Sequence, residues 1–319
     1  MSDTTSSAGW FAPAPPSIAV EVTSRRVTVA SVSAARGRPT VGAYASEALP
    51  DGAVTPALAG LNIVAPDDVV AALGRALEQA GLRAARRAAL VVPDHVARVS
   101  LVTLTDVPAR PADLDTILRW QLRKSLPFPI GEARVAHFVA HADGASTTFA
   151  TVAAREDVLA QYEGVTSALD IHAGIVDLAG FNVVNAILAG GRLDGDALVV
   201  CLAPESTTLA ILRDGHLMFC RQRAAVHDEP LDTLVHQTAM YHRDRLGGAT
   251  FRHVWLAGAA SQSAESAGAR AQIEQRLGLA VQEVDVRPLV GLKNRSITAA
   301  DLDALAAPVG VILRESRVA

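Results

Sequence analysis

The chain has 319 residues, of which half are apolar and only 4% aromatic, so a sizeable core must be built from Ala, Val and Leu. This length suits one large or two moderate domains. The 29 basic and 33 acidic residues give a net charge of −4, and this balance does not indicate a nucleic-acid-binding protein. Two cysteines, Cys201 and Cys220, are too few for a secreted disulfide scaffold and fit a reducing compartment.

The sequence also argues against a membrane-spanning or secreted protein. No apolar run approaches the roughly 20 residues that cross a bilayer. The N-terminus lacks the basic and apolar regions of a signal peptide, and the Ser, Thr, Ala and Pro content of residues 1–16 predicts a disordered tail. We therefore expect a cytoplasmic protein that reaches a membrane only through a partner.

In chain order, the apolar patterning predicts alternating strands and helices. Strands are expected in residues 18–32 (as a hairpin), 40–45, 88–93, 100–105, 134–141, 146–154, at the start of 174–189, in 197–222 and in 252–257. Helices are expected in residues 67–80, 111–126, 157–169, the rest of 174–189, 232–246, 267–277 and 299–314.

A three-strand meander occurs twice in this pattern, at 18–45 and at 197–222, each time followed by mixed helix and strand. The simplest architecture is an α/β fold with two lobes and a cleft between them. We place lobe I at 17–181, including an inserted subdomain around 46–145, and lobe II at 182–298. Residues 299–319 are expected to form a C-terminal helix that returns to lobe I.

Five short segments, in order along the chain, carry a family resemblance. They are Leu49-Pro-Asp-Gly-Ala-Val54, Ser125-Leu-Pro-Phe-Pro-Ile130, Val152-Ala-Ala-Arg-Glu-Asp-Val158, Gly174-Ile-Val-Asp-Leu-Ala-Gly-Phe-Asn182 and Ala307-Pro-Val-Gly-Val-Ile-Leu-Arg314. The set resembles the actin-like ATPase superfamily and, within it, type IV pilus assembly proteins of the PilM family. The resemblance implies an actin-like two-lobed fold on the cytoplasmic face of the inner membrane. It also implies binding to the N-terminal tail of a PilN-type bitopic protein, and several members of the family bind ATP.

In that superfamily two facing hairpins hold the nucleotide phosphates, each with a turn of acid, apolar residue and glycine. The first turn here keeps the acid, Glu21, but has Thr23 where the glycine would be. The second turn has Cys201 in the acidic position and Ala203 for the glycine, followed by Pro204, which has no N–H to donate.

The third loop, Leu256-Ala-Gly-Ala-Ala-Ser261, resembles the adenosine-side turn but keeps only Gly258. We therefore expect a degenerate ATP site, and the residues that would line it are Glu21, Thr23, Ser24, Ser206, Thr207 and Gly258. Phosphoryl transfer depends almost wholly on metal-assisted positioning, so ATP hydrolysis should be negligible. No cofactor is required on this interpretation, and weak binding of ATP with Mg stays open.

Two rival interpretations remain for the chain as a whole. One is an ATP-binding switch or weak ATPase of the same fold. The other is the cytoplasmic module of a type II secretion platform, which shares the fold. Possible self-association is also left open.

Two groups of polar residues suggest further sites. Trp120 lies beside Arg119, Arg123 and Lys124 on the predicted helix 111–126, and this patch could contact an extended peptide or anionic lipid heads. The alternative is a solvated helix face. A histidine-containing group matches no metal-ligand spacing, so we expect solvated residues and no metal there: His227, Asp228, Glu229, His236 and His242.

Overall fold

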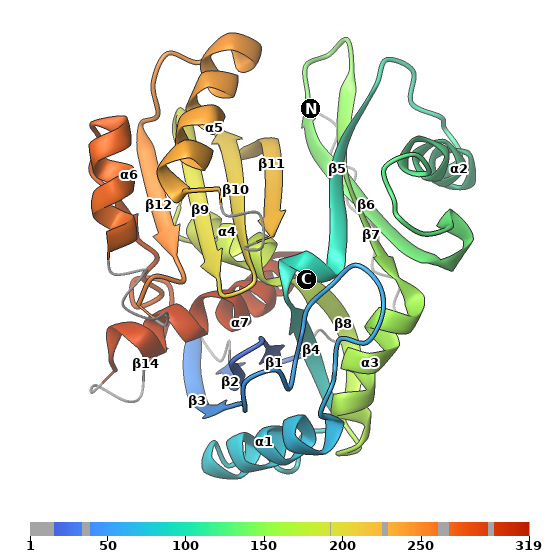
Figure 1. The fold of residues 1–319 in the computed structure, drawn as a ribbon, viewed down its shortest axis with the longest axis vertical. Helices are drawn as coiled ribbons and strands as arrows, with labels where there is room; N and C mark the ends of the chain where they lie inside the picture. The colour runs from blue at the N-terminus through green and yellow to red at the C-terminus, as the bar shows by residue number, and fades with distance from the viewer. Residues whose placement is uncertain are drawn as a thin grey trace.

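The structure is a computed structural model that describes residues 16–33, 39–191, 193–224, 229–260, 268–292 and 297–318. The tail predicted for 1–16 lies, apart from its last residue, outside the described residues. The described chain contains a six-stranded, a five-stranded and a three-stranded sheet with helices packed around them (Figure 1).

The six-stranded sheet combines an antiparallel meander with two parallel strands. Its strands in spatial order are β14 (Gly291–Leu292), β3 (Thr40–Ala48), β2 (Arg26–Ser33), β1 (Ile18–Val22), β4 (Arg87–Val92) and β8 (His172–Leu178). The Val- and Ala-rich strands β1, β2 and β4 are buried on both faces. Helices α1 (Pro66–Gln79) and α3 (Glu156–Ser167) pack against one face, and α7 (Ala299–Val318) packs against the other.

The five-stranded sheet repeats the antiparallel meander. Its strands in spatial order are β11 (His216–Ala224), β10 (Ser206–Arg213), β9 (Asp196–Ala203), β12 (His253–Ala257) and β13 (Gln282–Glu283). Helices α5 (Leu231–Leu246) and α6 (Ala269–Leu277) cover one face. The free cysteines Cys201 and Cys220 lie on β9 and β11, separated by β10, as expected.

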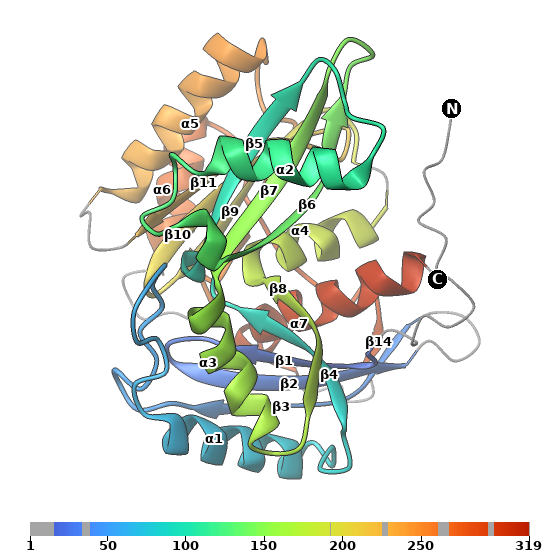
Figure 2. The same ribbon diagram turned by 90° about the vertical axis from the view of Figure 1, so that its right-hand side faces the viewer.

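The three-stranded sheet has the order β5 (Ala97–Leu104), β7 (Thr147–Arg155) and β6 (Ala133–Ala142). Helix α2 (Pro111–Leu122) covers its outer side (Figure 2), and short 3₁₀ turns, η1 (Asp94–Val96) and η2 (Ile130–Glu132), precede β5 and β6. Strand β6 is at one edge of this sheet and β8 is at one edge of the six-stranded sheet. Both edges become important for the site described below.

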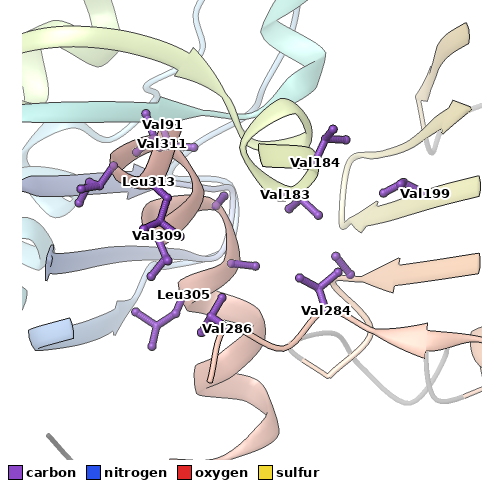
Figure 3. Close-up of a cluster of buried hydrophobic side chains, with 14 of the residues drawn as sticks. Val91, Val183, Val184, Val199, Val284, Val286, Leu305, Val309, Val311 and Leu313 are labelled. Atoms are coloured by element: carbon purple, nitrogen blue, oxygen red, sulfur yellow. The ribbon is translucent and has the colours of Figure 1, made fainter. Parts of the chain in front are cut away.

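Helices α4 (Ala179–Ala189) and α7 lie between the two large sheets and share one apolar cluster with both of them (Figure 3). Val183 and Val184 of α4 and Leu305 and Val309 of α7 belong to this cluster. The two helices approach most closely at Gly310, where a Cβ would lie 1.8 Å from the backbone oxygen of Asn182.

Replacing Gly310 with alanine should therefore destabilise the protein by about 2 kcal/mol, because the added methyl group must push two helix backbones apart. Gly164, inside α3, has nothing within 4 Å of its Cβ position. Gly164→Ala should stabilise the protein by about 0.5–1 kcal/mol through helix propensity alone. Urea unfolding of both variants measures the difference; two shifts of the same sign would contradict the assigned packing.

The predicted elements are all present, with boundaries that differ by a few residues. The helix expected at 111–126 ends at Leu122, and the two-residue strands β13 and β14 were not predicted. The lobe boundaries proposed from the sequence remain predictions. Of the helices in the described residues, none has the length and hydropathy needed to cross a bilayer.

Candidate functional site

The three loops identified in the sequence meet where the two large sheets approach each other, and they enclose a cavity of about 90 Å³. The predicted residues Glu21, Thr23, Ser206 and Gly258 line it. Pockets for nucleotide-sized ligands measure roughly 300–1,000 Å³, so this cleft is too small for a nucleotide as it stands. The contacts that close the cleft come from side chains and backbone groups of the chain itself.

The β1–β2 turn uses its own hydrogen-bond donors internally. The Thr23 N–H donates to the Arg26 carbonyl at 2.9 Å, and the Thr23 hydroxyl donates to the same oxygen at 3.0 Å. The Arg25 and Arg26 N–H groups donate to the Thr23 hydroxyl oxygen at 3.3 and 3.0 Å. Three backbone N–H groups of this turn are therefore not directed at a ligand, and the Thr23 hydroxyl accepts two of these bonds.

The β9–β10 turn faces the first turn and contacts it directly. The Ser24 hydroxyl donates to the Glu205 carboxylate at 2.7 Å. Pro204, beside Glu205, contributes no N–H. A carboxylate of the chain thus accepts the hydrogen bond that Ser24 could have offered to a phosphate.

Asp94 forms a second contact across the cleft. It follows β4, and its carboxylate accepts the Thr208 hydroxyl of β10 at 2.6 Å and the Gly180 N–H of α4 at 2.7 Å. Burial raises the pKa of Asp94 above its usual range, against the effect of these hydrogen bonds. Thr208 lines the cavity, whereas the predicted Thr207 does not, because alternate strand residues face opposite sides.

The backbone N–H groups of the third loop also donate to a carboxylate of the chain itself. The N–H groups of Gly258 and Ala260 donate to the two carboxylate oxygens of Asp303, on α7, at 2.6 and 3.1 Å. Gly258 has a φ of +87°, and a Cβ there would lie 1.9 Å from the Leu202 carbonyl oxygen. The glycine therefore has a packing reason to be present. Ser261, the last residue of this loop, lies outside the described residues.

Glu21 is the buried acid of the cleft. Its side chain carries an oxygen, Oε2, that has no hydrogen-bond partner and lies 3.7 Å from the Arg26 guanidinium. Burial raises the pKa of Glu21 to about 7, Arg26 opposes this, and the carboxylates of Asp303, Asp94 and Glu205 add to it. Arg26 is thus partly buried beside Glu21.

A second and larger cavity, of about 570 Å³, lies between β6, β8, α4 and the β10–β11 turn; we call it the β6–β8 groove. Its lining is mainly apolar. Phe138 of β6 and Phe181 of α4 meet in it edge to face, with ring centroids 5.5 Å apart. Phe138 and Val139 are 45% and 56% exposed, unusually high for large apolar side chains on one strand.

Charged groups lie at the margins of the β6–β8 groove. Asp177 of β8 pairs with Arg314 of α7, and burial raises the pKa of Asp177 while Arg314 opposes that change. Arg134 of β6 donates to Glu156 and Glu163 at 2.7 and 2.6 Å. These cations are already paired, so the groove offers mainly apolar surface and strand edges to a ligand.

The other predicted residues lie elsewhere. Trp120 is 59% exposed, and it, Arg123 and Lys124 sit at the C-terminal end of α2 without lining the groove. His242 was expected to be solvated, but it is 2% exposed and its Nε2 lies 2.6 Å from Asp196, so that expectation is wrong. His227 and Asp228 lie outside the described residues, and no metal-binding group of His, Cys, Asp and Glu is found among the residues described.

The sequence interpretation missed Asp94, Asp177 and Asp303. Asp94 and Asp177 occur at or just after the ends of the neighbouring parallel strands β4 and β8, the edge where ligands bind in open α/β sheets, and this position could have identified them. Asp303 lies near the start of α7 and gave no such signal.

The sequence and the fold of the chain were compared with those of known proteins. The family model described as "Type IV pilus assembly protein PilM" matches residues 19–243. A solved PilM–PilN type IV pilus biogenesis complex is similar with a TM-score of 0.78 and 16% identity, covering 95% of this chain and 99% of that one. No curated protein sequence matches the chain.

A second solved structure, from Bacteroides thetaiotaomicron and described as having an actin-like ATPase fold, is similar with a TM-score of 0.52 and 7% identity. The match covers 86% of this chain and 91% of that one. The expected α/β, two-lobed actin-like fold is confirmed by these two likenesses. Because the family model spans well over half of the residues, the chain belongs to the PilM family of type IV pilus assembly proteins.

Proposed function

We propose that this chain is a scaffold of a type IV pilus inner-membrane assembly platform and that it binds the N-terminal tail of a PilN-type protein in the β6–β8 groove. The observation that carries the proposal is the groove itself, an apolar cavity of about 570 Å³ between the edge strands of two different sheets. The complex of a family member with PilN supports the choice of partner. Recruitment by that partner would hold the chain at the cytoplasmic face of the membrane.

The groove suits an extended peptide for two reasons. Edge strands carry unpaired N–H and C=O groups, and a peptide that adds to an edge satisfies them. Alternate side chains of the peptide can then enter the apolar cavity, where Phe138 and Phe181 offer aromatic contact area.

The proposed scaffold works without a nucleotide. The β1–β2 turn directs its N–H groups inward, Pro204 has none, and Asp303 occupies the N–H groups of the third loop. We infer that ATP neither binds usefully nor is hydrolysed in this cleft. Mg-ATP at millimolar concentration should leave the melting temperature unchanged, and a saturable rise would instead support the ATP-switch alternative.

Fluorescence anisotropy with a labelled peptide of the PilN-type tail tests the groove. Phe138→Glu should weaken binding roughly tenfold or more, because it replaces an aromatic contact with a charge that must lose water. Phe138 is partly exposed in the free protein, so circular dichroism should show an unchanged fold.

Trp120→Glu is the matched control, an identical change at an exposed aromatic residue outside the groove. It should leave the affinity unchanged. If Trp120→Glu weakens binding and Phe138→Glu does not, the patch of Trp120, Arg123 and Lys124 is the docking surface instead. If neither wild-type nor variant protein binds the peptide, the proposed partner is wrong.

A further inference from the structure

Three hydrogen-bonded contacts cross the interlobe cleft, and in each of them a carboxylate of the chain is the acceptor. Ser24 donates to Glu205, Thr208 donates to Asp94, and the third loop donates to Asp303. In every case one partner lies in the β1–β2 turn, in η1 or on α7, and the other lies on a strand of the five-stranded sheet or in a loop next to one. The contacts therefore join the two halves of the molecule.

The acceptors come from both sides of the cleft. Glu205 reaches from the five-stranded sheet, whereas Asp94 and Asp303 reach toward it. Gln222 of β11 adds a fourth contact by donating to the Asp94 backbone oxygen at 2.9 Å. A hydrogen bond in a partly buried site is stronger than the same bond in water, and loss of one partner leaves a costly unsatisfied group.

In a nucleotide-dependent cleft of this shape, a bound anion would bridge the two hairpin turns. Here the Glu205 carboxylate lies between them, 2.7 Å from the Ser24 hydroxyl, and the cavity that remains is about 90 Å³. We propose that Glu205, with Asp94 and Asp303, forms an internal lock that holds the two lobes closed in place of a nucleotide.

The lock has a consequence for the β6–β8 groove, and this step alone rests on the proposed function. Leu212, Gly215 and Leu217 of the five-stranded side form one wall, while β6, β8 and α4 form the others. His141 of β6 also lies 3.0 Å from the Leu217 carbonyl oxygen. Opening of the lobes would move the walls apart, so the lock keeps the groove at a fixed width.

Distance measurement between two spin labels tests the lock directly. Labels attached through Arg83→Cys, after α1, and Arg243→Cys, on α5, report on opposite ends of the molecule, and both positions are exposed (Figure 1). The native Cys201 and Cys220 are free and half-buried, so both are replaced by alanine in every labelled variant.

The labelled protein should show one narrow distance that millimolar Mg-ATP does not alter. The double variant Ser24→Ala/Glu205→Ala, and separately Thr208→Val, should add a longer distance, with the ratio of open to closed molecules rising roughly tenfold or more. Glu283→Ala is the control, since Glu283 pairs only within the five-stranded half, with Arg270. It should leave the distance unchanged.

Three outcomes would overturn the lock: a distance in the wild type that shortens on addition of Mg-ATP, a broad wild-type distribution, or variants indistinguishable from Glu283→Ala. Melting curves of every variant show whether the fold is retained, and Thr208→Val supplies a second test if the double variant unfolds. Because the labels report without peptide, failure of the lock is distinguishable from failure of the proposed partner.

Discussion

Replacement of Gly258 by alanine is expected to lower the free energy of unfolding by about 3–5 kcal/mol. Two effects add at this position. The backbone has a φ of +87°, which an L-residue adopts only at a cost, and the new Cβ would lie 1.9 Å from the carbonyl oxygen of Leu202. The third loop cannot move away from Leu202 without disturbing its contact with Asp303.

Gly81 provides a control that separates the two effects. Its φ is +67°, but nothing lies within 4 Å of its Cβ position. Gly81→Ala should cost only about 1–2 kcal/mol, the penalty of the left-handed backbone alone. Urea unfolding of both variants gives the contribution of the close approach as the difference. Equal losses would mean that Leu202 does not restrict position 258.

The same position shows what the sequence could and could not reveal. From the sequence, Gly258 is interpreted as a remnant of an adenosine-binding turn, and this interpretation stays a prediction. Its contact with Leu202, however, joins residues 56 positions apart in the chain and follows from the parallel pairing of β9 and β12. Local patterning predicts a turn but contains no information about which backbone will lie against it.

The elements and the fold were predictable because their signals are local. The meander at β9, β10 and β11 follows from alternating apolar residues and the Arg213-Asp214-Gly215 turn, where Asp214 and Gly215 both have positive φ. Pro204 and Cys201 are equally local signals, and from them the sequence predicts a degenerate phosphate-binding turn, which stays a prediction.

The contacts across the cleft were harder to predict because they join distant segments. Ser24 is a predicted site residue, yet nothing in the sequence pairs it with Glu205 across 181 positions. The β6–β8 groove is harder still, since its walls come from many elements whose arrangement depends on the order of strands in three sheets. The exposed residues Trp120, Arg123 and Lys124 drew attention instead, because a basic and aromatic cluster on one helix is visible locally.

Glu21→Gln is expected to stabilise the protein by about 3 kcal/mol at about pH 8. The pKa of Glu21 is raised to about 7 from an ordinary value of 4.5. Above pH 7 the folded wild type must therefore hold a buried carboxylate, with one oxygen that lacks a hydrogen-bond partner. A neutral amide of the same shape removes that penalty.

The dependence on pH has a defined sign. An acid with a raised pKa binds its proton more tightly in the folded state, so between about pH 4.5 and 7 the folded chain carries more protons than the unfolded chain. The Glu21 contribution to the free energy of unfolding therefore falls as the pH rises through this window and is constant above it. The gain from Glu21→Gln should accordingly be largest at about pH 8 and disappear near pH 4.5.

Glu47, on β3 of the same sheet, is a control of opposite sign. Hydrogen bonds from Arg75 and Gln79 lower the pKa of Glu47. The ionised carboxylate therefore stabilises the folded state at pH values above the ordinary pKa of a glutamate, and this stabilisation is lost as the pH falls. Glu47→Gln should therefore destabilise the protein at about pH 8, where Glu21→Gln stabilises it. Urea unfolding of both variants at several pH values distinguishes the two cases. A loss of stability in Glu21→Gln at high pH would contradict this prediction. It would show that the ionised Glu21 carboxylate stabilises the fold by pairing with Arg26.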